Sequence, residues 1–259
     1  VLVLVILALL LPAGSAFAQD TQEDLSRKAA NPIANLMSLP FQNNADYGLG
    51  PYDRVSNVMN FQPVVPLAEG RVITRTIFPF SWVPDVSQET GTLSSGLSDI
   101  LFTAFYVPQS GSTMWGVGPV LEFPTGGEIR GRQKWSAGLS GVVLTQPGSW
   151  TLGLLANNVW SYAGDEDAPD VNKGSLQYFI VYQLGNGWAL SAGDLQIVFD
   201  WHDGRFAQVP VGFQLGVVRP ILGQPMRFFV NPQWNLVDTE GTFDSRILLG
   251  VTLIAPSGG

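Results

Sequence analysis

Five charged residues interrupt stretches of sequence that otherwise alternate between apolar and small or polar residues. Each lies on the face of its predicted strand opposite the apolar residues, and the set is Arg75, Asp99, Glu122, Arg227 and Arg246. On an inward face, such charges could line a passage and set its preference for a solute. They could also pair with one another and brace the interior, and we favour pairing because buried charges are usually paired.

The sequence has one histidine, His202, between Trp201 and Asp203. As a general base it would need a Ser or Thr nucleophile, which is the chemistry of a membrane hydrolase. No strained Gly-x-Ser-x-Gly turn accompanies it. We therefore interpret His202 as a solvated loop residue, assign no catalytic residue, and predict that the protein is not an enzyme.

Four carboxylates gather in one predicted loop, at Asp165, Glu166, Asp167 and Asp170. Oxygen ligands at this density could hold Ca²⁺, or Mg²⁺ that bridges lipopolysaccharide phosphates. Their spacing does not match a calcium-binding EF-hand loop, so we interpret the cluster as a solvated acidic loop. No metal and no cofactor is predicted.

Composition indicates what kind of elements hold these residues. Charged residues make up only 13% of the 259 residues, against roughly 25% in an average soluble protein. The net charge of −8 argues against nucleic-acid binding, and the absence of Cys excludes disulfides, Cys-ligated zinc and thiol catalysis. Low charge with 29 Gly and 11% aromatic residues is typical of a barrel whose outer surface faces lipid.

Apolar residues recur with a period of two, which places alternate side chains on opposite faces of a sheet. The clearest run is Val209 to Val217, and the uncharged run Gly174 to Gly193 is divided by the turn Gly185-Asn186-Gly187. The pattern predicts an all-β fold, a transmembrane antiparallel up-and-down β-barrel of about twelve strands with a short N-terminal helix. The predicted strands are 41–50, 54–67, 71–84, 95–109, 112–126, 134–147, 149–164, 172–185, 187–201, 206–221, 224–237 and 244–256.

The connections and the tryptophans support this prediction. Short turns alternate with longer, mainly acidic loops, as in barrels with short periplasmic turns and longer external loops. Tryptophan is expected at both membrane interfaces. One belt comprises Trp115, Trp150 and Trp188, and the other comprises Trp82, Trp135, Trp160, Trp201 and Trp234.

Some features disturb the pattern. Alternation slips at Gly193-Asp194 and again near Asn158. Prolines remove ladder donors inside five proposed strands, so we expect bulges near Pro63, Pro79, Pro119, Pro210 and Pro232. Twelve strands enclose a backbone radius of roughly 12 Å, which predicts a narrow or plugged pathway rather than a wide pore.

The N-terminal region divides into two parts. Residues 1–18 are predicted to be a signal peptide from a longer precursor, with a cleavage site at Ala16-Phe17-Ala18. Residues 19–40 form a periplasmic or plug segment before the barrel, 41–259. We expect a helix that begins at Asn31 and ends before Pro40, either packed in the lumen or part of a frayed tail.

With the strands placed, the chain resembles a family of Gram-negative outer-membrane proteins called "MetA-pathway of phenol degradation". This family is often labelled transporter and sometimes mislabelled neuromedin U. The resemblance is carried by residues 28–32, 39–44, 115–119, 124–125, 157 and 160–165. It implies an outer-membrane barrel that passes small, aromatic or hydrophobic compounds, and it supplies no catalytic residues.

We therefore predict an outer-membrane channel or transporter for small solutes in a Gram-negative bacterium. Its expected partners are the solute, outer-membrane lipid and lipopolysaccharide. The alternatives are a structural or surface-recognition barrel with a filled lumen and, less favoured, a lipid-modifying enzyme. We assign neither a particular solute nor an oligomeric state.

Overall fold

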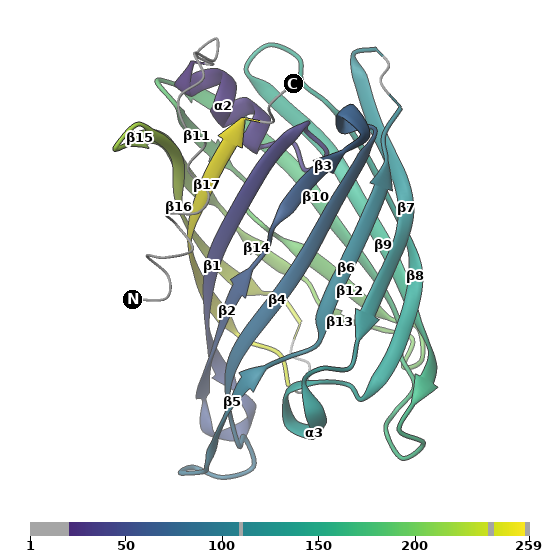
Figure 1. The fold of residues 1–259 in the computed structure, drawn as a ribbon. Helices are drawn as coiled ribbons and strands as arrows, with labels where there is room; N and C mark the ends of the chain where they lie inside the picture. Colours follow the sequence, from purple (N-terminus) through teal and green to yellow (C-terminus); the bar gives the residue numbers. More distant parts are fainter. Residues whose placement is uncertain (1–20, 109–110, 238–240, 257–259) are drawn as a thin grey trace.

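The computed structural model describes residues 21–108, 111–237 and 241–256 as a closed barrel with one short helix seated in an end of it (Figure 1). The predicted signal peptide, 1–18, lies outside the described residues. None of the described helices is long and apolar enough to cross a bilayer.

Seventeen strand segments in the described ranges make up twelve antiparallel strands. Eight strands are continuous: β1 (Leu36–Leu49), β4 (Val72–Pro84), β7 (Thr113–Phe123), β8 (Lys134–Thr145), β9 (Trp150–Gly164), β10 (Asn172–Gly185), β16 (Gln224–Asn235) and β17 (Ser245–Pro256). Four are interrupted: β2 (Arg54–Phe61) with β3 (Val64–Leu67), β5 (Leu93–Leu97) with β6 (Ile100–Tyr106), β11 (Trp188–Ser191) with β12 (Gln196–Asp200), and β13 (Arg205–Gln208) with β14 (Pro210–Gly212) and β15 (Gln214–Ile221). The helices are α2 (Gln22–Ala29) and α3 (Gly127–Arg130), with 3₁₀ turns η1 (Gly50–Tyr52) and η2 (Ala68–Gly70).

The first and last strands close the barrel. β1 pairs with β17 from Leu36↔Pro256 to Tyr47↔Ser245, and the other strands pair antiparallel with their neighbours in sequence. Closure leaves no sheet edge with unpaired backbone groups. The predicted fold class, a twelve-stranded antiparallel barrel with a short N-terminal helix, is confirmed.

The barrel is apolar outside, and its interior holds both polar side chains and apolar clusters. Along β17, Ile247 and Leu249 are exposed, whereas Leu248 and Thr252 between and beyond them are buried. The same alternation runs around the barrel and leaves exposed aromatic and aliphatic side chains on nearly every strand. Buried polar side chains face inward, among them Gln42, Asp46, Gln62, Ser140, Gln183, Gln214, Asn231 and Gln233.

The two ends of the barrel differ. At the short-turn end, strands join through brief connections such as Asn186-Gly187, where both residues have positive φ (50° and 73°), as a tight hairpin turn requires. At the long-loop end lie residues 85–92, 124–133, 165–171, 236–237 and 241–244, with α3 in the second of these loops. Helix α2 lies at the short-turn end (Figure 1).

The position predicted for the N-terminal helix is wrong. The helix spans Gln22–Ala29 rather than beginning at Asn31, and β1 begins at Leu36 rather than at residue 41. Thr21 and Asp24 form a reciprocal capping box that starts the helix. Residues 36–40 are strand because the last residues of β17 need a ladder partner when the barrel closes.

The five prolines lie beside or opposite gaps in the ladders, but the expected bulges are not found at Pro63, Pro119 and Pro232, where the register is the same on both sides. Pro63 falls in the break between β2 and β3, and Pro210 follows the break after β13. Pro79 lies opposite the break between β5 and β6, and Pro232 opposite the break between β14 and β15. At Pro119 the pairing with β6 skips from Val120 to Val117.

Candidate functional site

Helix α2 is fastened to the short turns around it. The Arg27 guanidinium donates to the carbonyl oxygens of Gly148, at 2.8 Å, and Gln146, and Gln146 Nε2 donates back to Arg27 O at 3.0 Å. Ser26 Oγ donates to Gln183 Oε1 at 2.8 Å. These bonds tie the helix to β10 and to the connection between β8 and β9.

Apolar contacts hold helix α2 and the residues that follow it inside the lumen. Leu25 is buried against Val218 and Ile254, whose side chains face inward from β15 and β17. Beyond the helix, Ile33 packs into a buried cluster that includes Ile73 and Phe105. We call residues 21–35 the plug; its side chains Leu25 and Ile33 pack against the inner wall of the barrel.

Between β11 and β12, the chain leaves the sheet and folds inward. Asp194 N donates to Asn231 Oδ1 at 3.0 Å, and Gln233 Nε2 donates to Asp194 O at 3.1 Å. Side chains of β16 thus replace the ladder bonds missing there. Gly193 has φ 109°, and a Cβ on it would lie 2.4 Å from Asn231 Nδ2, so this bulge requires glycine.

The bulge carries Asp194 to the centre of a hydrogen-bonded chain that crosses the lumen. Arg75 Nη2 donates to Gln62 Oε1 at 2.5 Å, and Gln62 Nε2 donates to Gln42 Oε1. Gln42 Nε2 in turn donates to Asp194 Oδ2 at 3.3 Å, and Gln177 Nε2 donates to Asp194 Oδ1. We call these five side chains the cross-lumen layer, because strands on both sides of the barrel contribute to it.

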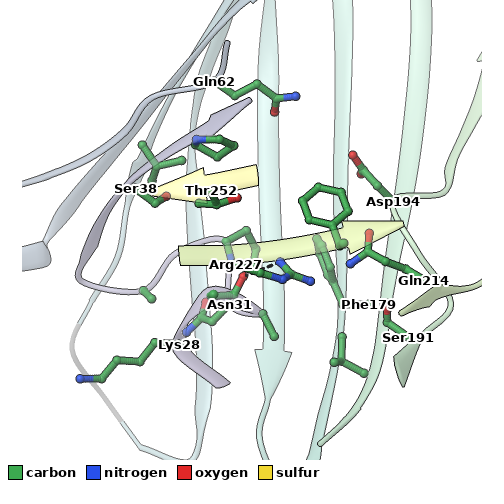
Figure 2. Close-up of a pocket in the computed structure, with 18 of the residues that line it drawn as sticks. Lys28, Asn31, Ser38, Gln62, Phe179, Ser191, Asp194, Gln214, Arg227 and Thr252 are labelled. Atoms are coloured by element: carbon green, nitrogen blue, oxygen red, sulfur yellow. Dashed lines mark hydrogen bonds between the residues drawn. The ribbon is translucent and has the colours of Figure 1, made fainter. Parts of the chain in front are cut away.

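The layer separates two cavities. The plug-side cavity has a volume of about 180 Å³ and lies between the plug and the layer (Figure 2). The loop-side cavity, of about 170 Å³, extends from the layer toward the long-loop end. All five layer residues line both cavities, so the layer is their common wall.

The three arginines among the predicted lumen residues have different surroundings. Arg246 lines the loop-side cavity and forms a two-bond ion pair with Asp46, at 2.5 and 2.7 Å. Arg75 and Arg227 line the plug-side cavity, and no carboxylate of the described residues lies within ion-pair distance of either. The pairing we favoured from the sequence therefore holds for Arg246 alone among these three.

The two predicted acidic residues lie elsewhere. Asp99 accepts hydrogen bonds from the backbone amides of Gly126, at 2.9 Å, and Arg132, at 2.6 Å. Glu122 forms an ion pair with Arg132 at 3.2 Å. Both carboxylates hold the loop that contains α3, and neither lines the two cavities.

The tryptophans lie on the outer surface of the barrel. All eight are exposed, and those of each predicted belt lie at or near strand ends on the same side of the barrel. Trp201 lies directly after β12, where its Nε1 donates to Asn158 Oδ1 at 2.6 Å. Its acceptor, Asn158, lies where the alternation of apolar and polar residues in the sequence slips.

The remaining candidates form no reactive cluster in the described part of the chain. The hydrogen bond of His202 is made by its backbone amide to Asp200 Oδ1, at 3.0 Å, and no bond joins its imidazole to a Ser or Thr hydroxyl there. Asp170 pairs with Lys134 at 3.2 Å, and the hydrogen bond from Lys134 holds the pKa of the Asp170 carboxyl below its ordinary value of 3.8. No group of three or more His, Asp or Glu side chains in the described ranges could hold a metal ion.

Sequence reasoning did not single out the cross-lumen layer beyond Arg75. Gln42, Gln62 and Gln177 are neutral and share no motif. The sequence does contain a signal for Asp194. The alternation of apolar and polar residues slips at Gly193-Asp194, where the chain turns into the lumen.

The comparisons with known proteins agree with this geometry at the level of the fold. No family model matches the sequence, and no curated protein matches it significantly. The crystal structure of the COG4313 outer membrane channel from Pseudomonas putida F1 is similar, with a TM-score of 0.55 over 85% of this chain and 94% of that chain, at 15% identity. The NanC porin gives a TM-score of 0.55 over 84% of this chain and 98% of its own, at 8% identity. The fold is thus similar to that of these two outer-membrane barrels.

Proposed function

We propose that this protein is an outer-membrane channel for small solutes, closed at rest by the plug and the cross-lumen layer. The observation that carries the proposal is the pair of cavities stacked in the lumen with one hydrogen-bonded wall between them. A solute that entered from the long-loop end would meet the layer and then the plug. The similar fold of a solved outer-membrane channel and a solved porin supports this function.

The outer surface supports a location in lipid. Exposed apolar side chains surround the barrel, whereas a soluble monomer rarely exposes apolar patches larger than a few hundred Å². Polar side chains among them satisfy one another, as Asn43 and Asn57 do through reciprocal amide bonds of 2.7 and 3.1 Å. In hydrocarbon no water is present to hydrogen-bond polar groups, so they must be satisfied within the protein. We infer an outer membrane, with lipid and lipopolysaccharide around the barrel and the short turns in the periplasm.

A structural barrel with a filled lumen is the second candidate. The Arg246–Asp46 ion pair is what a braced interior would contain. The channel is favoured because Arg75 and Arg227 lack carboxylate partners in the described chain and border open volume. The surroundings of His202 give no support to a lipid-modifying enzyme. Membership of the phenol-degradation family, with aromatic or hydrophobic solutes, stays a proposal.

Arg27→Ala tests the closed state of the channel. Loss of the bonds to Gly148 O and Gln146 O should loosen the plug and raise the flux of a small sugar into proteoliposomes several-fold. The control on the same helix is Glu23→Gln, because the side chain of Glu23 is exposed. Equal flux through wild type and Arg27→Ala would contradict plug closure, and an absence of flux through every variant would contradict the channel.

A further inference from the structure

The plug-side cavity has an excess of positive charge. The described residues that line it include Lys28, Arg75 and Arg227 but one acidic side chain, Asp194. The amino group of Lys28 points away from Arg227 and the cavity (Figure 2). The guanidinium groups of Arg75 and Arg227 therefore line this cavity together with a single carboxylate, that of Asp194.

Asp194 does not neutralise these guanidiniums by direct contact. Its Oδ1 accepts from Gln177 and its Oδ2 accepts from Gln42, and neither arginine is within ion-pair distance. Both arginines do interact with its charge at longer range. The carboxylate thus orients the cross-lumen layer and leaves the guanidinium donors available.

Most of those donors have no protein partner in the described chain. A guanidinium carries five N–H donors in a planar fork. Arg75 uses one on Gln62 Oε1, and Arg227 makes one long bond of 3.4 Å to Ala29 O. A guanidinium held away from bulk water needs an anion or water on its remaining donors. A carboxylate fits this fork with two parallel bonds.

The rest of the cavity wall matches an aromatic body. Phe179 and Phe229 both line it, and the Arg227 Cζ lies 5.1 Å from the centre of the Phe229 ring. A cavity of about 150 Å³ is known to accommodate benzene, and this cavity measures about 180 Å³. We propose that the plug-side cavity binds a small aromatic carboxylate, with its carboxylate on Arg227 and Arg75 and its ring beside the two phenylalanines. The inference rests on the proposed channel function and names the class of solute.

The test is equilibrium binding to the full chain in detergent micelles, by titration calorimetry with benzoate and with the neutral analogue benzyl alcohol. Benzoate should bind the wild type at least tenfold more tightly than benzyl alcohol does. Arg227→Gln and Arg75→Gln should each weaken benzoate binding at least tenfold, and Arg227→Lys should restore part of it. The matched control is Arg205→Gln, which removes an exposed arginine paired with Asp203 far from the cavity. Circular dichroism confirms that each variant is folded.

Equal affinity for benzoate and benzyl alcohol, or unchanged benzoate binding by the folded Arg227→Gln variant, would overturn the inference. Flux of both compounds into proteoliposomes separates this result from a failure of the channel. Flux without carboxylate preference overturns the site and leaves the channel in place. Selective benzoate binding without flux of any solute supports the site and overturns the proposed function.

Discussion

At the scale of single residues, glycines at two positions allow parts of the barrel wall to lie closer together than a side chain would permit. Gly193 lets the bulge approach Asn231, and Gly138 lets β8 approach β9. A Cβ on Gly138 would lie 1.7 Å from the carbonyl oxygen of Asn158, whereas a Cβ on Gly141 in the same strand would meet nothing within 4 Å. Gly138 and Gly141 therefore allow the same Gly→Ala substitution to be compared at a crowded and at an open position of one strand.

Gly138→Ala should destabilise the barrel by about 1–3 kcal/mol, because the new methyl group can be accommodated only by moving backbone. Gly141→Ala should change stability by no more than about 0.5 kcal/mol. The measurement is the midpoint of thermal unfolding in detergent, followed by circular dichroism. Equal midpoints for the two variants would show that β8 and β9 are not as close at Gly138 as the structure has them.

At the scale of elements, the strands and tight turns could be predicted from alternation and turn residues, because both signals are local. The helix was misplaced because Asn31-Pro32 is also a helix-start signal, whereas the capping box of Thr21 and Asp24 specifies the actual start. The cross-lumen layer could not be predicted. Its members meet only through the register and closure of the strands, and a one-residue change of register would reverse which face each residue occupies.

The start of α2 is predicted to be sensitive to acid. The hydrogen bond from the Thr21 hydroxyl lowers the pKa of the Asp24 carboxyl below its ordinary value of 3.8. A group whose pKa is lowered on folding stabilises the folded state above its unfolded pKa, and that contribution is lost as pH falls through the lowered value. Solute flux through the wild type should therefore rise as pH falls from 5 to below 3.8.

Asp24→Asn should show raised flux already at pH 7 and a smaller increase on acidification. Asp170→Asn is the control, because Asp170 also has a lowered pKa but lies at the opposite end of the barrel. If Asp24→Asn kept the wild-type pH profile, the capping box would not contribute to closure.

At the scale of the whole molecule, the barrel exposes apolar side chains on nearly every strand, whereas its interior combines polar side chains with apolar clusters. Water on the outside would make this arrangement unfavourable, whereas hydrocarbon makes it the stable one. The interruption between β11 and β12 is tolerated because Asn231 and Gln233 hydrogen-bond the backbone there from within the barrel.

Leu249→Arg tests the lipid-facing surface. Leu249 is 52% exposed, and Val230 of the neighbouring strand lies opposite it in the ladder. Arginine at the midplane should cost about 2–4 kcal/mol of folding free energy in phospholipid vesicles, against about 0–1 kcal/mol near an interface. Leu236→Arg, just beyond β16 at the long-loop end, supplies the interface control. Equal costs at both positions would argue against a bilayer around the strands.

The most direct test of the whole account is to lock the plug in place. The chain has no cysteine, so Ser26→Cys with Gln183→Cys introduces a unique pair at a contact of 2.8 Å between the native side chains. With the pair joined by a short, reducible thiol crosslink, single-channel conductance in a planar bilayer should be abolished, and reduction should restore it. Conductance that is identical in the joined and reduced states would contradict a lumen closed by residues 21–35.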